Sequence, residues 1–243
     1  MVQIYAIMHL LPIFAIMLIV MEGLDGAGKS TQVKMFREYL ESVSPDVEYI
    51  HFPRYDAPVY GELISKFLRG DFGPNDSVHP QLVALLFAED RRTASESIRS
   101  TLERGGTVLL DRYVYSNIAY QCAKMPTEEG AEQLRKWILN TEYGQFGLPR
   151  PDLNMFLDVP ISFVQESLSR QRYGDERSYL HGHQDIHEAD ISFQRKVRDM
   201  YRRQAGEDSR FIPIDCGDAQ GAMLPPKAIF SKIKECYENH KEN

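Results

Sequence analysis

The segment Gly23–Ser30, which reads GLDGAGKS, constrains the fold of this chain more than any other feature. It follows an apolar run at residues 17–21 and precedes an amphipathic stretch, so it lies where a strand gives way to a helix. Glycines at this spacing let successive backbone N–H groups converge on an oligophosphate, and the start of the helix adds partial positive charge. The lysine can reach the outer phosphates, and the serine hydroxyl can ligate Mg²⁺. The pattern predicts a phosphate-binding loop; a Gly-rich turn with a solvated lysine would leave the glycine spacing unexplained.

Apolar runs and helix-patterned stretches alternate along the rest of the chain. Helical spacing is expected over residues 30–43, about 79–104, 127–146, 161–170, 189–205 and a C-terminal segment. Strands are expected at residues 17–22, 47–52, 107–111, 153–158 and 211–215. Pro213 indicates that the last of these is an edge strand or a late strand. This order predicts an α/β fold with a doubly wound five-stranded parallel sheet of the P-loop NTPase type.

Composition allows one compact α/β domain, although the length would suit one domain or two, and it favours local basic patches around a small anionic ligand. The chain has 243 residues, with no linker-like or low-complexity stretch and no internal repeat. Its net charge of −7 argues against a nucleic-acid surface. Its three cysteines show no C-x-x-C spacing and cannot all pair, which is typical of a reducing cytoplasm.

The N-terminal stretch is ambiguous. Residues 1–21 contain no Lys, Arg, Asp or Glu, but the phosphate loop needs residues 17–22 as its leading strand. The remaining residues 1–16 include Pro12 and fall short of the roughly 20 that span a bilayer. They also lack the basic region of a secretory signal. We therefore expect an apolar extension at residues 1–16, with Met17 as the functional start, and a single domain over residues 17–243; a peripheral membrane anchor is the alternative.

Charged residues follow directly after two of the predicted strands. Ligands of such sheets bind beyond the carboxyl ends of the strands. Arg54 can therefore grip a second phosphate, although a surface arginine fits its position equally well. A carboxylate at Asp111 would face the metal, and Arg112 can clamp the phosphate of a phosphoryl acceptor. The alternative for these two residues is an ordinary surface ion pair.

One helix carries a candidate base-recognition pair. Phe87 and Arg91 are four residues apart and share a helix face. A ring that stacks on a base, beside a guanidinium that donates to a base carbonyl, would suit thymine or uracil. Taken alone, such a pair is more typical of core packing plus a surface charge.

The stretch 110–121, LDRYVYSNIAYQ, resembles the thymidylate kinase signature D-R-[YHF]-x-x-S-x-x-A-[YF]. Residues 52–54, 87–91, 151–152 and 157–159 resemble further stretches of that family, in the right order. The resemblance implies a nucleoside monophosphate kinase-like fold with a mobile lid. It also implies transfer of the ATP γ-phosphoryl group to dTMP with Mg²⁺, giving dTDP for dTTP biosynthesis, usually in a homodimer.

The same resemblance implies roles for individual residues. The ATP cradle comprises Gly23, Leu24, Asp25, Gly26, Ala27, Gly28, Lys29, Ser30 and Thr31. The dTMP site comprises Asp25, Arg54, Tyr55, Phe87, Arg91, Arg112, Ser116, Asn117, Tyr120 and Gln121. Ser30 and Asp111 would hold the metal, and Tyr120 would crowd a ribose 2′-hydroxyl. Catalytic roles fall to Lys29, Asp25, Arg112 and Arg172.

The lid is expected at about residues 169–188. It contains three arginines, and Asp185 and Glu188 resemble the family's D-x-x-E motif; the arginines are Arg170, Arg172 and Arg177. The phosphate loop has no arginine between Asp25 and Lys29, so closure of the lid would bring a cation onto the transferring phosphoryl group. Arg172 is the candidate, although the sequence alone does not single out one of the three, and a solvated charged loop is the alternative.

Three histidines of the expected lid have a spacing that metal sites also use. His181, His183 and His187 form H-x-H-x₃-H and could ligate a transition metal. In a lid we interpret them as polar loop residues.

Two other function classes remain open at this point. A sibling kinase with another acceptor would keep the phosphate loop but alter Phe87, Arg91 and Tyr120. A P-loop protein that binds nucleotide only as a regulatory module would not need a second phosphate clamp. No general base is expected, because an oxygen of a monophosphate is already ionised at neutral pH.

Overall fold

The computed structural model describes residues 16–170, 175–183, 185–188 and 190–241, and the side chains of residues 175–177 are not described. Five parallel strands form one sheet in the order β2-β3-β1-β4-β5. Their bounds are β1 (Leu18–Gly23), β2 (Val47–His51), β3 (Thr107–Asp111), β4 (Leu153–Asp158) and β5 (Phe211–Asp215). The sheet therefore has the doubly wound form that the sequence predicts, with β5 at an edge.

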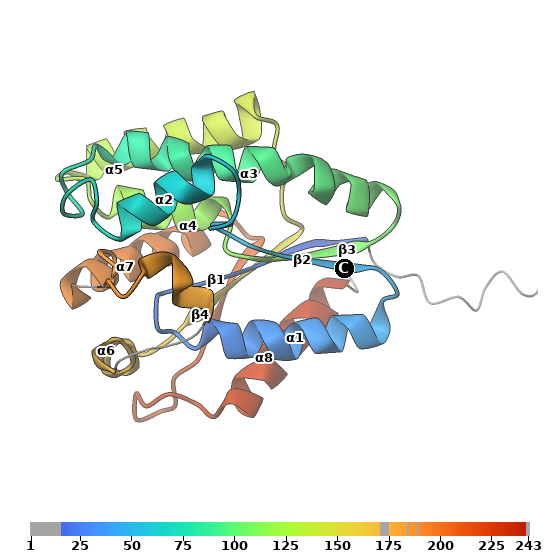
Figure 1. The fold of residues 1–243 in the computed structure, drawn as a ribbon. Helices are drawn as coiled ribbons and strands as arrows, with labels where there is room; N and C mark the ends of the chain where they lie inside the picture. Colours follow the sequence, from blue (N-terminus) through green and yellow to red (C-terminus); the bar gives the residue numbers. More distant parts are fainter. Residues whose placement is uncertain (1–15, 171–174, 184, 189, 242–243) are drawn as a thin grey trace, which may run out of the picture.

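Helices cover both faces of the sheet (Figure 1). On one face, α1 (Lys29–Val43) packs against β1, β2 and α8 (Pro226–Lys241). The helices of the other face are α3 (Pro80–Glu103), α4 (Val114–Cys122), α5 (Glu128–Leu139) and α7 (Ile191–Glu207). The strands β1 and β3 are buried along their whole length, as expected for a parallel sheet covered on both faces.

Three further short elements lie around the carboxyl ends of the strands. They are α2 (Tyr60–Leu68), α6 (Ile161–Ser169) and the 3₁₀-helix η2 (Asp175–Leu180). The sequence does not predict α2, because only nine residues carry its pattern. Its apolar face forms a small separate cluster with α3 through Ile64, Phe67, Leu68 and Val83.

One predicted helix is interrupted. The sequence indicates a helix over residues 127–146, but α5 ends at Leu139 and continues as the π-helix η1 (Asn140–Gln145). The wider turn of a π-helix re-aims the side chains that follow it, and such turns are frequent at functional sites. Here it directs Glu142, which has no solvent exposure, toward α3.

The first described residues already belong to the sheet layer. Met17 is buried, and its carbonyl accepts a hydrogen bond from the backbone N–H of Val108. Of the extension expected at residues 1–16, residues 1–15 lie outside the described residues, and Ile16 is exposed. In the described part of the chain, no helix combines the length and apolar character needed to cross a membrane.

Candidate active site

The phosphate loop surrounds a hollow at the carboxyl edge of the sheet. Gly26 and Gly28 have φ of 74° and 72°, a left-handed conformation that glycine adopts without strain, and Gly28 is the N-cap of α1. The loop therefore directs the first turn of α1 toward this space, which we call the loop hollow. Its lining includes every residue of the predicted ATP cradle after Gly23, from Leu24 to Thr31. Anions bind readily at such a helix N-terminus.

A buried ion pair lies on one side of the loop hollow. The ammonium group of Lys29 contacts Asp111 Oδ1, and His51 Nδ1 lies 3.1 Å from Asp111 Oδ2. The sheet register explains this contact, because His51 and Asp111 are paired neighbours at the ends of β2 and β3. Burial opposes ionisation of Asp111, but Lys29 and His51 outweigh it and hold its pKa below the ordinary range. At neutral pH Asp111 is therefore ionised, and its carboxylate oxygens can act as metal ligands.

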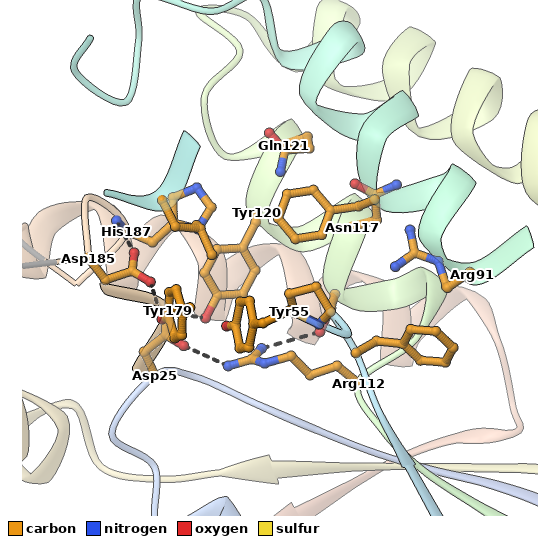
Figure 2. A pocket seen from close by; sticks show the side chains of 15 residues that line it. Asp25, Tyr55, Arg91, Arg112, Asn117, Tyr120, Gln121, Tyr179, Asp185 and His187 are labelled. Carbon is orange, nitrogen blue, oxygen red and sulfur yellow. Dashed lines mark hydrogen bonds and ion pairs between the residues drawn. The ribbon is translucent and has the colours of Figure 1, made fainter. Parts of the chain in front are cut away.

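A second hollow lies deeper between the sheet edge and the helices, and we call it the inner hollow (Figure 2). Its empty volume, counted together with the space that opens to solvent, is about 520 Å³. Nine of the predicted dTMP-site residues line it: Asp25, Tyr55, Phe87, Arg91, Arg112, Ser116, Asn117, Tyr120 and Gln121. Asp25, Tyr55, Arg112 and Tyr179 line both hollows, so the two spaces adjoin.

Arg112 stands at the junction of the two hollows. Its backbone φ of 68° is left-handed, which is unusual for a residue with a side chain and is typical of functional sites. Its Nη2 donates to Asp25 Oδ1 at 2.7 Å and its Nη1 to the Gly23 carbonyl at 2.9 Å. Tyr120 Oη donates to the other oxygen of Asp25 at 2.8 Å. A cation and an anion are thus fixed side by side between the loop hollow and the inner hollow.

Arg91 and Asn117 lie together at another end of the inner hollow (Figure 2), where the buried Glu142 balances the charge of Arg91. Arg91 makes two hydrogen bonds to Glu142, Nε to Oε2 at 2.5 Å and Nη2 to Oε1 at 2.8 Å, and both side chains are buried. Asn117 Nδ2 also donates to Glu142 Oε1 at 2.9 Å. The buried oxygens Asn117 Oδ1 and Gln121 Oε1 have no hydrogen-bond partner among the described residues. A ligand with polar edges would satisfy them, because unpaired buried oxygens are costly.

The Arg91–Glu142 pair should contribute strongly to stability. We expect Glu142→Ala to lower the free energy of unfolding by about 3–5 kcal/mol, because it leaves a guanidinium buried without its partner. Urea unfolding of the free protein measures this loss. The matched control is Glu89→Ala on α3, whose partner Arg92 is exposed; its loss should stay below about 1 kcal/mol. Similar losses in both variants would contradict the structural role given to Glu142.

Two residues of the expected D-x-x-E motif reach the hollows. Asp185 lines the inner hollow and Glu188 the loop hollow. Burial and then the nearby Asp25 and Glu188 carboxylates raise the pKa of Asp185 to about 7. Tyr179 donates to Asp185 Oδ2 at 2.8 Å and stacks face to face on Tyr55, with ring centroids 3.7 Å apart (Figure 2). The lid segment is therefore in contact with the loop that follows β2.

The structure gives little information on the three arginines of the expected lid. Arg170 pairs with Glu166 on the exposed end of α6. Arg172 lies outside the described residues, and the side chain of Arg177 is not described. The cation that the sequence predicts for the lid therefore stays a prediction.

Arg54 does not line either hollow. Its Nε donates to Asp90 Oδ1 at 2.9 Å and its backbone N–H to Asp90 Oδ2 at 2.9 Å. Its neighbours Pro53 and Tyr55 do line the inner hollow. The predicted phosphate contact of Arg54 would require its guanidinium to turn away from Asp90.

The three histidines do not behave as a group. His181 and His183 are exposed, whereas His187, which also lies in a turn, is buried in the inner hollow beside Tyr120. Among the residues described, no group of three or more His, Cys, Asp or Glu side chains could hold a metal ion.

Sequence reasoning missed two residues of the site. Glu142 fixes Arg91, and Tyr179 closes the junction of the hollows against Tyr55. Neither belongs to a motif, and each meets its partner across a long stretch of chain. Tyr179 was inside the expected lid, so its aromatic character was the one available signal.

Comparison with known proteins gives consistent matches. A family model described as "Thymidylate kinase" matches residues 21–221. Thymidylate kinase of Plasmodium falciparum is 35% identical over 81% of this chain and 80% of its own length. That of Mycobacterium tuberculosis is 32% identical over 86% of this chain and 98% of its own length. The solved structure of Candida albicans thymidylate kinase superposes with a TM-score of 0.69 at 29% identity, covering 93% of this chain and 92% of that one.

Proposed function

The chain belongs to the thymidylate kinase family and is an ATP-dependent kinase that phosphorylates dTMP to dTDP; we propose that ATP occupies the loop hollow and dTMP the inner hollow. One observation supports this assignment above the others. Asp25 and Arg112 line both hollows, so a donor phosphate and an acceptor phosphate bound there would meet end to end. Such alignment supplies much of the catalysis of phosphoryl transfer, because it replaces an encounter in solution.

On the ATP side, the phosphates rest on the backbone N–H groups of the loop. Lys29 releases Asp111 and contacts the outer phosphates as ATP enters. Two oxygen donors, Ser30 and Asp111, line the same hollow, and oxygen ligands of this kind suit Mg²⁺. These two residues would hold the ion, which when bound neutralises charge on the phosphates.

On the dTMP side, Arg112 holds the phosphate because its guanidinium already lies at the junction of the hollows. Its planar fork suits two phosphate oxygens at once. Arg54 serves as a second clamp only if it exchanges Asp90 for the phosphate. Asp25 accepts a hydrogen bond from the 3′-hydroxyl of the sugar. Tyr55 and Ser116 line the part of the hollow between the phosphate and the sugar.

The base occupies the end of the hollow near Arg91. Phe87 stacks on the thymine ring, and Arg91 donates to a base carbonyl. Asn117 and Gln121 offer their unpaired oxygens to sugar and base. Tyr120 forms the wall beside the sugar, where its ring leaves no room for a ribose 2′-hydroxyl.

The chemical step needs positioning and charge neutralisation rather than a covalent intermediate. An ionised oxygen of dTMP attacks the γ-phosphorus in line, and no group has to remove a proton. Lys29, Arg112 and a lid arginine, with Arg172 as the candidate, neutralise the charge that spreads over the equatorial oxygens. Closure of the lid, through Asp185 and Glu188, excludes water from the site.

Exposed apolar residues and free cysteines are relevant to the oligomeric state and the cellular compartment of the protein. Leu82 and Leu85 of α3 are exposed, at 60% and 37%, and pairing of two chains over α3 would cover them. Cys122, Cys216 and Cys236 are free thiols, which suits a reducing cytoplasm. We therefore propose a cytoplasmic homodimer.

A panel of acceptors tests the proposed function. ADP release from ATP should be fastest with dTMP, lower with dUMP, and at least about a hundredfold lower in kcat/KM with UMP, CMP and AMP. The reason is that the first two acceptors lack the crowding 2′-hydroxyl and carry a base edge that Arg91 can read. A preference for CMP or AMP would indicate a sibling kinase, and ATP binding without transfer to any of the five would indicate a regulatory nucleotide module.

A further inference from the structure

A fully buried carboxylate lies directly behind the phosphate clamp. Glu22 is the residue before the phosphate loop, at the carboxyl end of β1, and it has no solvent exposure. Four hydrogen-bond donors surround it. Its Oε1 accepts from the backbone N–H groups of Tyr113 and Ser116, at 2.9 and 3.1 Å, and its Oε2 from the hydroxyls of Ser116 and Tyr201, the latter at 3.0 Å. A carboxylate rarely lies in such a position without a specific task, because burial of the charge is costly.

The backbone contacts hold the start of α4. Tyr113 is the N-cap of this helix and makes no side-chain cap, so the first N–H groups of α4 depend on another acceptor. Glu22 supplies it from a different strand. The residue just before Tyr113 is Arg112, in its left-handed conformation. Because the following N–H is fixed, this strained conformation is held in place.

The hydroxyl contacts continue to the guanidinium. Arg112 Nη1 donates to Ser116 Oγ at 3.2 Å and lies 3.4 Å from Tyr201 Oη. These are the two hydroxyls that also donate to Glu22, and they lie 2.7 Å from each other. Burial raises the pKa of Glu22, and the Ser116 hydroxyl and the Arg112 charge oppose that rise. One network thus joins the buried carboxylate to both the backbone and the side chain of Arg112.

We propose that Glu22 is a positioning residue of the dTMP site, whose buried carboxylate orients Arg112 through Ser116, Tyr201 and the first turn of α4. The inference rests on the proposed role of Arg112 as the dTMP phosphate clamp. Glu22 itself touches neither substrate, since it lines neither hollow. Its effect should therefore appear in the affinity for dTMP and not in the affinity for ATP.

The test compares the KM of dTMP and the KM of ATP in matched variants. Glu22→Gln keeps the shape but loses an acceptor, and it should raise the KM of dTMP about tenfold with the KM of ATP changed by less than about twofold. Tyr201→Phe should shift the KM of dTMP in the same direction. The control is Tyr115→Phe, which removes a phenol–carboxylate hydrogen bond to Asp208 away from the hollows and should leave both constants unchanged.

A double-mutant cycle separates positioning from a general structural effect. In an Arg112→Lys background, Glu22→Gln should change the KM of dTMP by less than about twofold more. The reason is that the network then no longer orients a guanidinium group. Full additivity, equal shifts in both KM values, or no shift in the KM of dTMP would overturn the inference. If Arg112→Lys alone leaves the KM of dTMP unchanged, the proposed clamp has failed instead. Should Glu22→Gln not fold, the same cycle with Tyr201→Phe decides the question.

Discussion

Replacement of Lys29 with alanine is expected to lower turnover at least about a hundredfold while the fold persists. The ammonium group is the cation that the loop directs at the outer phosphates, and it lies buried against Asp111 before ATP binds. Loss of one such preorganised charge costs about a hundredfold to a thousandfold in turnover. A coupled assay of ADP release at saturating ATP and dTMP measures the loss, and thermal unfolding reports the fold.

Lys66→Ala is the matched control for that variant. Lys66 pairs with Glu62 on the surface of α2, away from both hollows, so its removal should leave turnover unchanged. Turnover of the Lys29→Ala protein within about tenfold of the unaltered chain would contradict the assignment of the loop hollow to ATP.

Arg112→Lys is expected to have the second largest effect, at least about a hundredfold in kcat/KM for dTMP. Lysine retains the charge but not the planar fork, so it cannot hold two phosphate oxygens and also keep Asp25 and the Gly23 carbonyl as partners. Arginine and lysine both carry a side chain, so the left-handed backbone at position 112 is equally strained in the unaltered protein and in the variant. Steady-state kinetics with each substrate varied should show the loss in the KM of dTMP and in kcat.

The equivalent change at Arg54 ranks the two predicted clamps. Because the Arg54 guanidinium is held by Asp90, Arg54→Lys should reduce kcat/KM for dTMP by less than Arg112→Lys does. A larger effect at Arg54 than at Arg112 would show that the arrangement in the free protein is not the one that binds dTMP.

Local signals explain what the sequence could predict. The phosphate loop is contiguous, and each strand of the sheet is an unbroken or alternating apolar run, so strand bounds and fold class follow from neighbouring residues alone. The position of the inner hollow could also be predicted from the sequence. Parallel strands end at one edge of the sheet, so the residues after β3 and on α3 and α4 meet there.

Long-range pairing explains what the sequence could not predict. Glu142 reaches Arg91 across 51 positions and does so from a π-helix that no periodicity indicates. Asp90, which is 36 positions away in the sequence, holds the guanidinium of Arg54. The sequence predicted a phosphate contact for Arg54 because it does not reveal this ion pair. The burial of His187 depends on the aromatic side chains of Phe67, Tyr120 and Phe193, which come from three different helices.

The central claim is that two phosphate sites adjoin at Asp25 and Arg112. The most direct measurement is a crystal structure of the protein with ADP and dTMP bound together. We expect the β-phosphate of ADP within the loop formed by residues 23–30 and the dTMP phosphate within hydrogen-bond distance of the Arg112 guanidinium, with thymine against Phe87. Thymidine monophosphate bound outside the inner hollow, or with its phosphate turned away from the loop, would contradict the account.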